Sequence, residues 1–276
     1  METKGTFIHP SAVVHKKTRL DYSVRIGPAC VIGPDVSIGK KTCLDGGVHI
    51  SGVTEIGEEN RFWPHSVIGA EPQDLSYKGE PTRVVIGDRN IFREFMTVHR
   101  GTPKDKAVTR IGSNNYFMAY SHIGHDCQVG DHVVFINGAT LGGHCAVDDY
   151  AQVGSYTGVH PFCRIGKYAF TGGFSVLTRD LVPFCRVAGS RPPLLYGVNS
   201  IGLLRNGFSK DKIKNIKTMY KLLFFSGLNT SQAMEKFMTL VPEGWERNEM
   251  LSFVRSSKRG IIKKAEPGAG IRADER

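Results

Sequence analysis

The chain has 276 residues, 40% of them hydrophobic, which is enough to bury a sizeable core and argues against a disordered protein. Its 36 Lys and Arg residues outnumber 26 Asp and Glu residues, and the formal net charge of +10 favours nucleic acid, phosphates or an acidic protein as partners. The N-terminus has no basic region followed by an apolar stretch, and the longest aliphatic and aromatic cluster, residues 222–225, is far too short to span a bilayer. We therefore expect a cytoplasmic protein with no membrane span, whose six cysteines are free thiols.

An apolar anchor residue recurs every six positions through most of the segment from Ile8 to Leu177. The series runs unbroken from Ile8 to Ile68, returns over 86–98 and resumes over 111–177, where Thr171 is the one anchor that is not apolar. Glycine follows the anchor in half of the repeats, and we attribute it to a turn that needs a permissive backbone. A fixed six-residue period is typical of a parallel β-helix, in which three hexads make one triangular coil.

Positions i and i+18 should stack on successive coils at roughly the strand spacing of 4.8 Å. Cys127, Cys145 and Cys163 have this spacing, so we expect an interior ladder of small side chains and no metal site. Two segments rich in Pro, Gly and charge, at about 70–85 and 99–110, break the period and should leave the prism as loops.

After about residue 190 the hexads stop and a helical pattern begins. Ser209 can cap a helix that ends near Gly227, and two shorter helices are expected around 231–241 and 246–257. The sequence thus predicts a β-helix over 1–190, an α-helical domain over 191–264 and a disordered tail over 265–276. Residues 191–276 contain 16 Lys and Arg against 8 Asp and Glu, so most of the basic surplus lies in the helical part.

One predicted edge of the prism carries several histidines. His125 lies two positions after an anchor, where side chains point outward, and Gly143 follows at the equivalent position of the next coil. Asp126 and His144 are stacked in the same way. The polar residues brought to this edge are His122, His125, Asp126, His144 and His160.

This set of side chains suits acyl transfer. A neutral imidazole can act as a general base, a neighbouring carboxylate can fix its tautomer, and the unobstructed N–H of Gly143 can stabilise an oxyanion. The chain has no G-x-S-x-G motif, and its interior cysteines cannot serve as nucleophiles. We therefore expect direct transfer between two substrates that are bound together.

Several longer motifs are more specific than the hexads, among them QDLSYKGEPTRVVIGDRN, TVHRGT, HIGHDCQVG and GVHPFCRIG. Through them the chain resembles the UDP-N-acetylglucosamine O-acyltransferases of lipid A biosynthesis, a family of hexapeptide-repeat acyltransferases, over roughly residues 7–262. The resemblance implies a mainly β fold, a left-handed parallel β-helix followed by a small C-terminal α-helical domain. The basic surplus of residues 191–276 leads us to expect that this domain binds the acidic acyl carrier protein. The resemblance also implies a homotrimer with active sites between subunits, with no cofactor, metal or nucleic acid.

The resemblance further implies transfer of a 3-hydroxyacyl chain from acidic acyl carrier protein to the glucosamine 3-hydroxyl of UDP-N-acetylglucosamine. His125 would be the general base, Asp126 would orient it, and the Gly143 amide would polarise the thioester carbonyl. Gly173 matches the position that limits acyl length, although an ordinary repeat glycine is an equal interpretation. The substrate site would be lined by Asp74, Ser76, His99, His122, His144, His160, Asn199 and Arg205.

Four positions depart from the family pattern, which leaves the acceptor open. The family commonly has Lys where this chain has Ser76, Gln where it has Pro161, Glu where it has Ile201 and Arg where it has Asn206. Transfer to a 3-amino UDP-sugar is therefore an alternative, as is transfer from acetyl-CoA. Two further alternatives are a γ-type carbonic anhydrase, which would bind zinc through His122, His125 and His144, and a scaffold without enzymatic activity. The related N-acyltransferase of the same pathway is less favoured, because it would need a globular uridine-binding domain before the repeats and the repeats begin here by Ile8.

Overall fold

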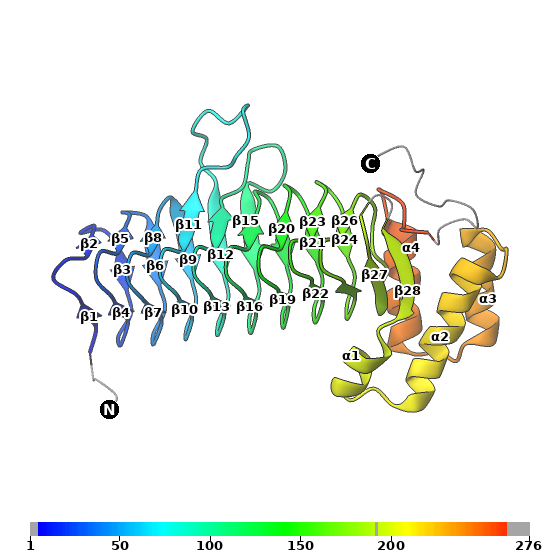
Figure 1. Ribbon diagram of the computed structural model, residues 1–276. Coiled ribbons are helices and arrows are strands. Elements are labelled where there is room, and N and C mark those ends of the chain that lie inside the picture. Colours follow the sequence, from blue (N-terminus) through cyan, green and yellow to red (C-terminus); the bar gives the residue numbers. More distant parts are fainter. Residues whose placement is uncertain (1–4, 191–192, 264–276) are drawn as a thin grey trace, which may run out of the picture.

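The computed structural model describes residues 5–190 and 193–263, in which short strands form a long triangular prism and four helices lie at its C-terminal end (Figure 1). The predicted disordered tail, 265–276, lies outside the described residues. None of the helices within these ranges is long and apolar enough to cross a bilayer.

The strands form three sheets, which we name A, B and C, one on each face of the prism. Sheet A contains β1 (Phe7–Ile8), β4 (Arg25–Ile26), β7 (Cys43–Leu44), β10 (Arg61–Phe62), β13 (Ile91–Phe92), β16 (Tyr116–Phe117), β19 (Val134–Phe135), β22 (Gln152–Val153), β25 (Phe170–Thr171), β27 (Cys185–Ala188) and β28 (Leu194–Val198). Sheet B contains β2 (Val13–Val14), β5 (Val31–Ile32), β8 (His49–Ile50), β11 (Val67–Ala70), β14 (Thr97–His99), β17 (His122–Ile123), β20 (Thr140–Leu141), β23 (Gly158–Val159) and β26 (Val176–Leu177). Sheet C contains β3 (Arg19–Leu20), β6 (Val36–Ile38), β9 (Val53–Ile56), β12 (Arg83–Ile86), β15 (Val108–Ile111), β18 (Gln128–Val129), β21 (Ala146–Val147) and β24 (Arg164–Ile165).

The chain visits the sheets in the order A, B, C, so that the prism has an AB edge, a BC edge and a CA edge. Neighbouring strands pair in parallel in every case except β27 with β28, as Phe7 does with Arg25, and in most coils the numbering advances by 18. The interval rises to 30 between Arg61 and Ile91 and to 25 between Ile91 and Tyr116 because a loop leaves the prism in each of these coils. Both loops therefore project from the BC edge (Figure 1).

The loops are shorter than the sequence predicted. They span 71–82 and 100–107, whereas we predicted about 70–85 and 99–110. The difference arises because the strands on either side of each loop have three or four residues and continue the parallel ladder into the predicted loop, as β12 does against β15.

The anchors form the core. Phe62, Phe92 and Phe117 are fully buried and stack in sequence, with ring centroids 4.5 and 5.0 Å apart. The predicted cysteine ladder is also interior, since Cys127 and Cys163 have no exposed surface, and all six cysteines are free. Burial raises the pKa of the Cys163 thiol to about 11, so it is not a nucleophile at neutral pH.

The explanation predicted for the repeat glycines is wrong. The left-handed backbone conformation falls three residues after the anchor, usually on a residue other than glycine, such as Asp126 (φ 61°) or His144 (φ 61°). The glycine after the anchor has ordinary φ in most coils. At Gly39, a Cβ atom would lie only 2.6 Å from the carbonyl carbon of Gly57. The glycine is therefore needed where successive coils approach closely.

The C-terminal end is more mixed than predicted. The three predicted helices are confirmed as α2 (Lys210–Phe225), α3 (Thr230–Leu240) and α4 (Trp245–Ser256), and the Ser209 hydroxyl caps α2 by accepting from Lys212 N at 3.3 Å. However, residues 194–198 form β28, which pairs antiparallel with β27, and a short helix α1 (Ser200–Arg205) follows it. The helices therefore begin at 200 and not at 191, because the chain first completes sheet A.

Candidate active site

His125 and Asp126 occupy the turn of the BC edge that follows β17. The Nδ1 of His125 lies 2.8 Å from the Asp126 Oδ2, and the two side chains are 15% and 0% exposed. Because an ionised carboxylate only accepts hydrogen bonds, Nδ1 carries the proton, and the Nε2 of the neutral ring keeps its lone pair. The predicted base and its orienting carboxylate are thus in contact.

Thr102, in the loop 100–107, also holds the carboxylate of Asp126. Its backbone N–H lies 2.9 Å from each carboxylate oxygen, and its Oγ1 donates to Oδ2 at 2.7 Å. The backbone N–H of Asp126 donates to Thr109 Oγ1 at 2.8 Å. Sequence reasoning did not single out Thr102, although it is the last residue of the TVHRGT motif.

Gly143 lies directly against the His125 ring. A Cβ atom on Gly143 would lie 2.4 Å from the His125 Cε1, so only glycine fits beneath this ring. Its backbone N–H donates to no acceptor in the described part of the chain, whereas the next amide, that of His144, donates to His125 O at 2.9 Å. An open N–H beside the base is the arrangement required of an oxyanion donor.

His144 extends the polar edge by one coil. Its Nε2 is 3.7 Å from the Asp126 Oδ2 and its Nδ1 is 3.8 Å from Asp105 Oδ2. The ring stacks on Phe162 at 4.5 Å and meets His125 edge to face at 5.0 Å. Packing on both sides fixes its orientation.

His99 and His122 lie beside the base on the outer side of sheet B, with ring centroids 5.1 Å apart. Burial lowers the pKa of His122 to about 4 and also lowers the pKa of His99, so both rings are neutral at pH 7. His122 Nδ1 is 2.8 Å from Thr97 Oγ1. The Nδ1 of His99 is buried and has no hydrogen-bond partner among the described residues, which leaves it for a ligand.

Asp74 and Ser76 lie in the first loop, and Lys104 in the second holds the two loops together. Asp74 Oδ2 accepts from Lys104 Nζ at 2.7 Å, while its Oδ1 accepts from the backbone N–H and hydroxyl of Ser76. The hydrogen bond from Lys104 and those from Ser76 hold the pKa of Asp74 well below its usual range. Lys104 thus supplies a cation near the position where Ser76 replaces a lysine.

His160 stands one coil beyond His144 on the same edge and is exposed. Its Nδ1 lies 2.7 Å from the Nη2 of Arg259, which comes from the segment that follows α4. Sequence reasoning did not predict Arg259 because it lies 99 positions after His160.

Known proteins resemble both parts of the chain. A model of the hexapeptide repeats of bacterial transferases matches residues 109–143, and the second domain of UDP-N-acetylglucosamine O-acyltransferases matches residues 180–262. The acyl-[acyl-carrier-protein]–UDP-N-acetylglucosamine O-acyltransferase of Syntrophobacter fumaroxidans is 50% identical over 93% of this chain and 99% of its own length. Its namesake in Thermodesulfovibrio yellowstonii is 45% identical over the same shares. The chain belongs to this family.

The solved structure of Francisella novicida UDP-N-acetylglucosamine acyltransferase superposes with a TM-score of 0.91, at 40% identity over 95% of each chain. The O-acyltransferase family and the left-handed β-helix with a C-terminal helical part are therefore confirmed. The carbonic anhydrase and scaffold alternatives are set aside.

Three residues predicted for this acyltransferase site do not reach His125 within one chain. Asn199 caps α1 by accepting from Gly202 N and donates to Tyr168 O at 3.0 Å. Arg205 is exposed in the last turn of α1. Gly173 lies on the AB edge, where a Cβ atom would meet the Ser155 hydroxyl at 2.8 Å.

The candidate site also contains a set of atoms with metal-binding character. Ligand atoms of His125, Asp126 and His144 lie within 4.8 Å of one another. The carbonic anhydrase alternative would use His122 as a third ligand, but this set contains Asp126 in its place. Asp126 already accepts hydrogen bonds from His125 and Thr102, which accounts for this carboxylate without an ion.

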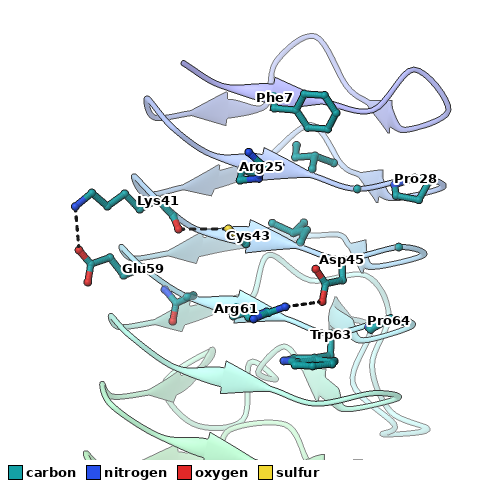
Figure 2. A pocket seen from close by; sticks show the side chains of 15 residues that line it. Phe7, Arg25, Pro28, Lys41, Cys43, Asp45, Glu59, Arg61, Trp63 and Pro64 are labelled. Carbon is teal, nitrogen blue, oxygen red and sulfur yellow. Dashed lines mark hydrogen bonds and ion pairs between the residues drawn. The ribbon is translucent and has the colours of Figure 1, made fainter. Parts of the chain in front are cut away.

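A cavity of about 740 Å³ lies elsewhere, on the outer face of sheet A near the N-terminus (Figure 2). Two of its cations are paired, since Arg61 lies 3.6 Å from Asp45 and Lys41 lies 3.7 Å from Glu59. It contains none of the predicted site residues, and we assign it no role in the acyltransferase reaction.

Proposed function

We propose that this cytoplasmic O-acyltransferase moves a 3-hydroxyacyl chain from acyl carrier protein to the glucosamine 3-hydroxyl of UDP-N-acetylglucosamine, the first step of lipid A biosynthesis. The contact between His125 and Asp126, beside the open N–H of Gly143, carries the proposal. The two similar proteins described above are named as acyl-[acyl-carrier-protein]–UDP-N-acetylglucosamine O-acyltransferases, and these names support acyl carrier protein and UDP-N-acetylglucosamine as the substrates.

The reaction is a direct transfer. His125 Nε2 removes the proton of the sugar hydroxyl as its oxygen attacks the thioester carbonyl carbon, and the Gly143 N–H stabilises the oxyanion. When the tetrahedral intermediate collapses, the C–S bond breaks and the imidazolium returns its proton to the leaving thiolate. Asp126 stabilises the imidazolium, and no acyl group is attached to the enzyme.

A homotrimer would complete the substrate site. Asn199, Arg205 and Gly173 lie away from His125 in one chain, so a neighbouring subunit would bring them to it. The AB edge offers a contact surface of stacked aromatic rings, with Phe95 and Tyr120 5.1 Å apart and 45% and 63% exposed. Light scattering should give three times the chain mass of 30.4 kDa, and a monomer at micromolar concentration would contradict this part of the proposal.

The helical region would dock acyl carrier protein. Lys212, Lys214 and Lys217 are exposed on α2, and attraction between this face and an acidic carrier would raise the association rate and be screened by salt. Reversing all three charges should raise KM for carrier-bound acyl groups and flatten its salt dependence. An unchanged KM at low salt would show that this face does not bind the carrier.

A mass-spectrometric assay tests the proposed reaction. The panel combines acyl carrier protein thioesters of several chain lengths with UDP-N-acetylglucosamine and its 3-amino analogue. We expect O-acylated product, since the base needed to activate a hydroxyl is in place. Ser76 and Pro161 change the residues expected to contact the UDP-sugar and leave the base unchanged. Product from the amino sugar alone would therefore establish transfer to the 3-amino group.

A further inference from the structure

The segment after α4 returns to the BC edge and is fixed to the last coil. Asp180 N donates to Gly260 O at 2.9 Å, and Ile262 N donates to Asp180 O at 2.9 Å. The Ser257 hydroxyl donates to the buried Asp180 carboxylate at 2.7 Å. Ile261 and Ile262 are only 7% and 4% exposed. The backbone on both sides of Arg259 is therefore held in place, although its side chain is exposed.

The contact between Arg259 and His160 determines the tautomer of the imidazole. A guanidinium has donors and no acceptor, so the His160 Nδ1, 2.7 Å from the Arg259 Nη2, must accept. The ring is then neutral and its proton lies on Nε2. The Pro161 carbonyl, 3.1 Å from the same Nδ1, would favour the opposite tautomer. Both partners cannot be satisfied at once, and the shorter, charge-assisted contact to Arg259 dominates.

We propose that Arg259 is a positioning residue for acyl transfer, because it keeps His160 as an Nε2–H donor to an oxygen of the bound substrates. The inference rests on the proposed function in placing His160 at the substrate site. Without Arg259, the Pro161 carbonyl would compete for an Nδ1 proton, and only part of the population would present the donor. The C-terminal segment thus links the helical region to the chemistry of the BC edge.

The experiment compares Arg259→Met and Arg259→Lys with Lys258→Met in the full-length protein. Lys258 is an exposed neighbour on the same segment, so its substitution controls for the loss of one positive charge. We expect Arg259→Met to lower kcat/KM about tenfold, the weight of one hydrogen bond, with partial recovery in Arg259→Lys and no change in Lys258→Met. Comparing KM for the UDP-sugar with KM for the acyl carrier thioester identifies which substrate supplies the oxygen.

Two further measurements separate positioning from structural damage. Nitrogen-15 NMR of the His160 ring should show the Nε2–H tautomer in the wild-type protein and a mixture in Arg259→Met. In a His160→Ala background, Arg259→Met should have no further effect on kcat/KM, because its action passes through the imidazole. Additive losses, or an unchanged tautomer, would overturn the inference. If the wild-type protein transfers no acyl group to the UDP-sugar, the proposed function fails, while the NMR result still decides whether Arg259 sets the tautomer.

Discussion

The CA edge and the BC edge are built on the same hexad but treat their turn amides differently. On the CA edge, side chains of the next coil accept from these amides, as Asp131 does from Ser113 N at 2.6 Å and Asp149 from Asp131 N at 3.0 Å. At the equivalent position of the BC edge, the N–H of Gly143 has no acceptor in the described part of the chain. These two CA-edge donors are satisfied by side chains, whereas the Gly143 amide on the BC edge is left for a substrate.

The left-handed turn position shows the same contrast. On the CA edge it is occupied by His132, Tyr150 and Tyr168, whose rings stack 4.6 and 4.7 Å apart. On the BC edge it holds Asp126 and His144, next to the two loops. One backbone therefore serves two purposes, since the side chains at repeated positions decide whether an edge stabilises the prism or carries out chemistry.

Removing the base should have the largest effect. We expect His125→Ala to lower kcat/KM by roughly 10² to 10⁴, the usual contribution of a general base. The fold should persist because His125 is not an anchor, which circular dichroism and light scattering would verify. Activity within a few fold of wild type would remove His125 from the mechanism.

Filling the space at Gly143 tests the open amide. The added Cβ of Gly143→Ala would displace the His125 ring, so we expect roughly a 10²-fold loss of kcat, in the range for a disturbed oxyanion site. Gly46→Ala is a matched control, because Gly46 has the same hexad position on the AB edge and its Cβ would lie 3.4 Å from Pro28 Cγ. Equal losses in both variants would mean that glycine is needed there only for coil packing.

Thr102 joins the loop to the BC edge, and its removal should have a smaller effect. Thr102→Val removes the hydroxyl donor to Asp126 but keeps the backbone donor, so we expect about a tenfold fall in kcat/KM. Thr102→Ser retains the hydroxyl and should recover most of the activity. If the serine and valine variants are equally impaired, the hydroxyl has no role in orienting the carboxylate.

Asp148, on the CA side of the prism, should affect stability and not catalysis. Burial raises its pKa from 3.8 to about 6, although Arg164 lies 3.8 Å away. A raised carboxyl pKa means that the folded state is favoured below about pH 4 and loses this stabilisation as pH rises towards 6. Because the side chain is 28% exposed, we expect a modest loss of about 1 to 2 kcal/mol.

Urea unfolding of wild type and Asp148→Asn from pH 4 to 8 measures this difference at one protein concentration. The stability of the variant relative to wild type should rise across this range and then level off. A constant difference between the two proteins would show that Asp148 titrates normally.

How much of the molecule follows from sequence depends on the range of the interactions. The period of six with inward anchors is local and repeated, so it predicted the coil, the interior cysteines and the grouping of His125, Asp126 and His144 on one edge. The same local signals predicted α2, because its cap and its apolar spacing lie within one segment.

The tertiary structure decided what depends on contacts between distant segments. Strand β28 forms because it can pair with β27, and the repeat glycines are explained by the next coil and not by their own φ. Three side-chain hydrogen bonds join residues 24, 30 and 99 positions apart, namely those of Thr102 with Asp126, Lys104 with Asp74 and Arg259 with His160. A hydrogen bond needs its atoms within about 3 Å, and a repeat pattern places only the residues that obey its period, so loop and C-terminal partners became visible only once the chain was folded.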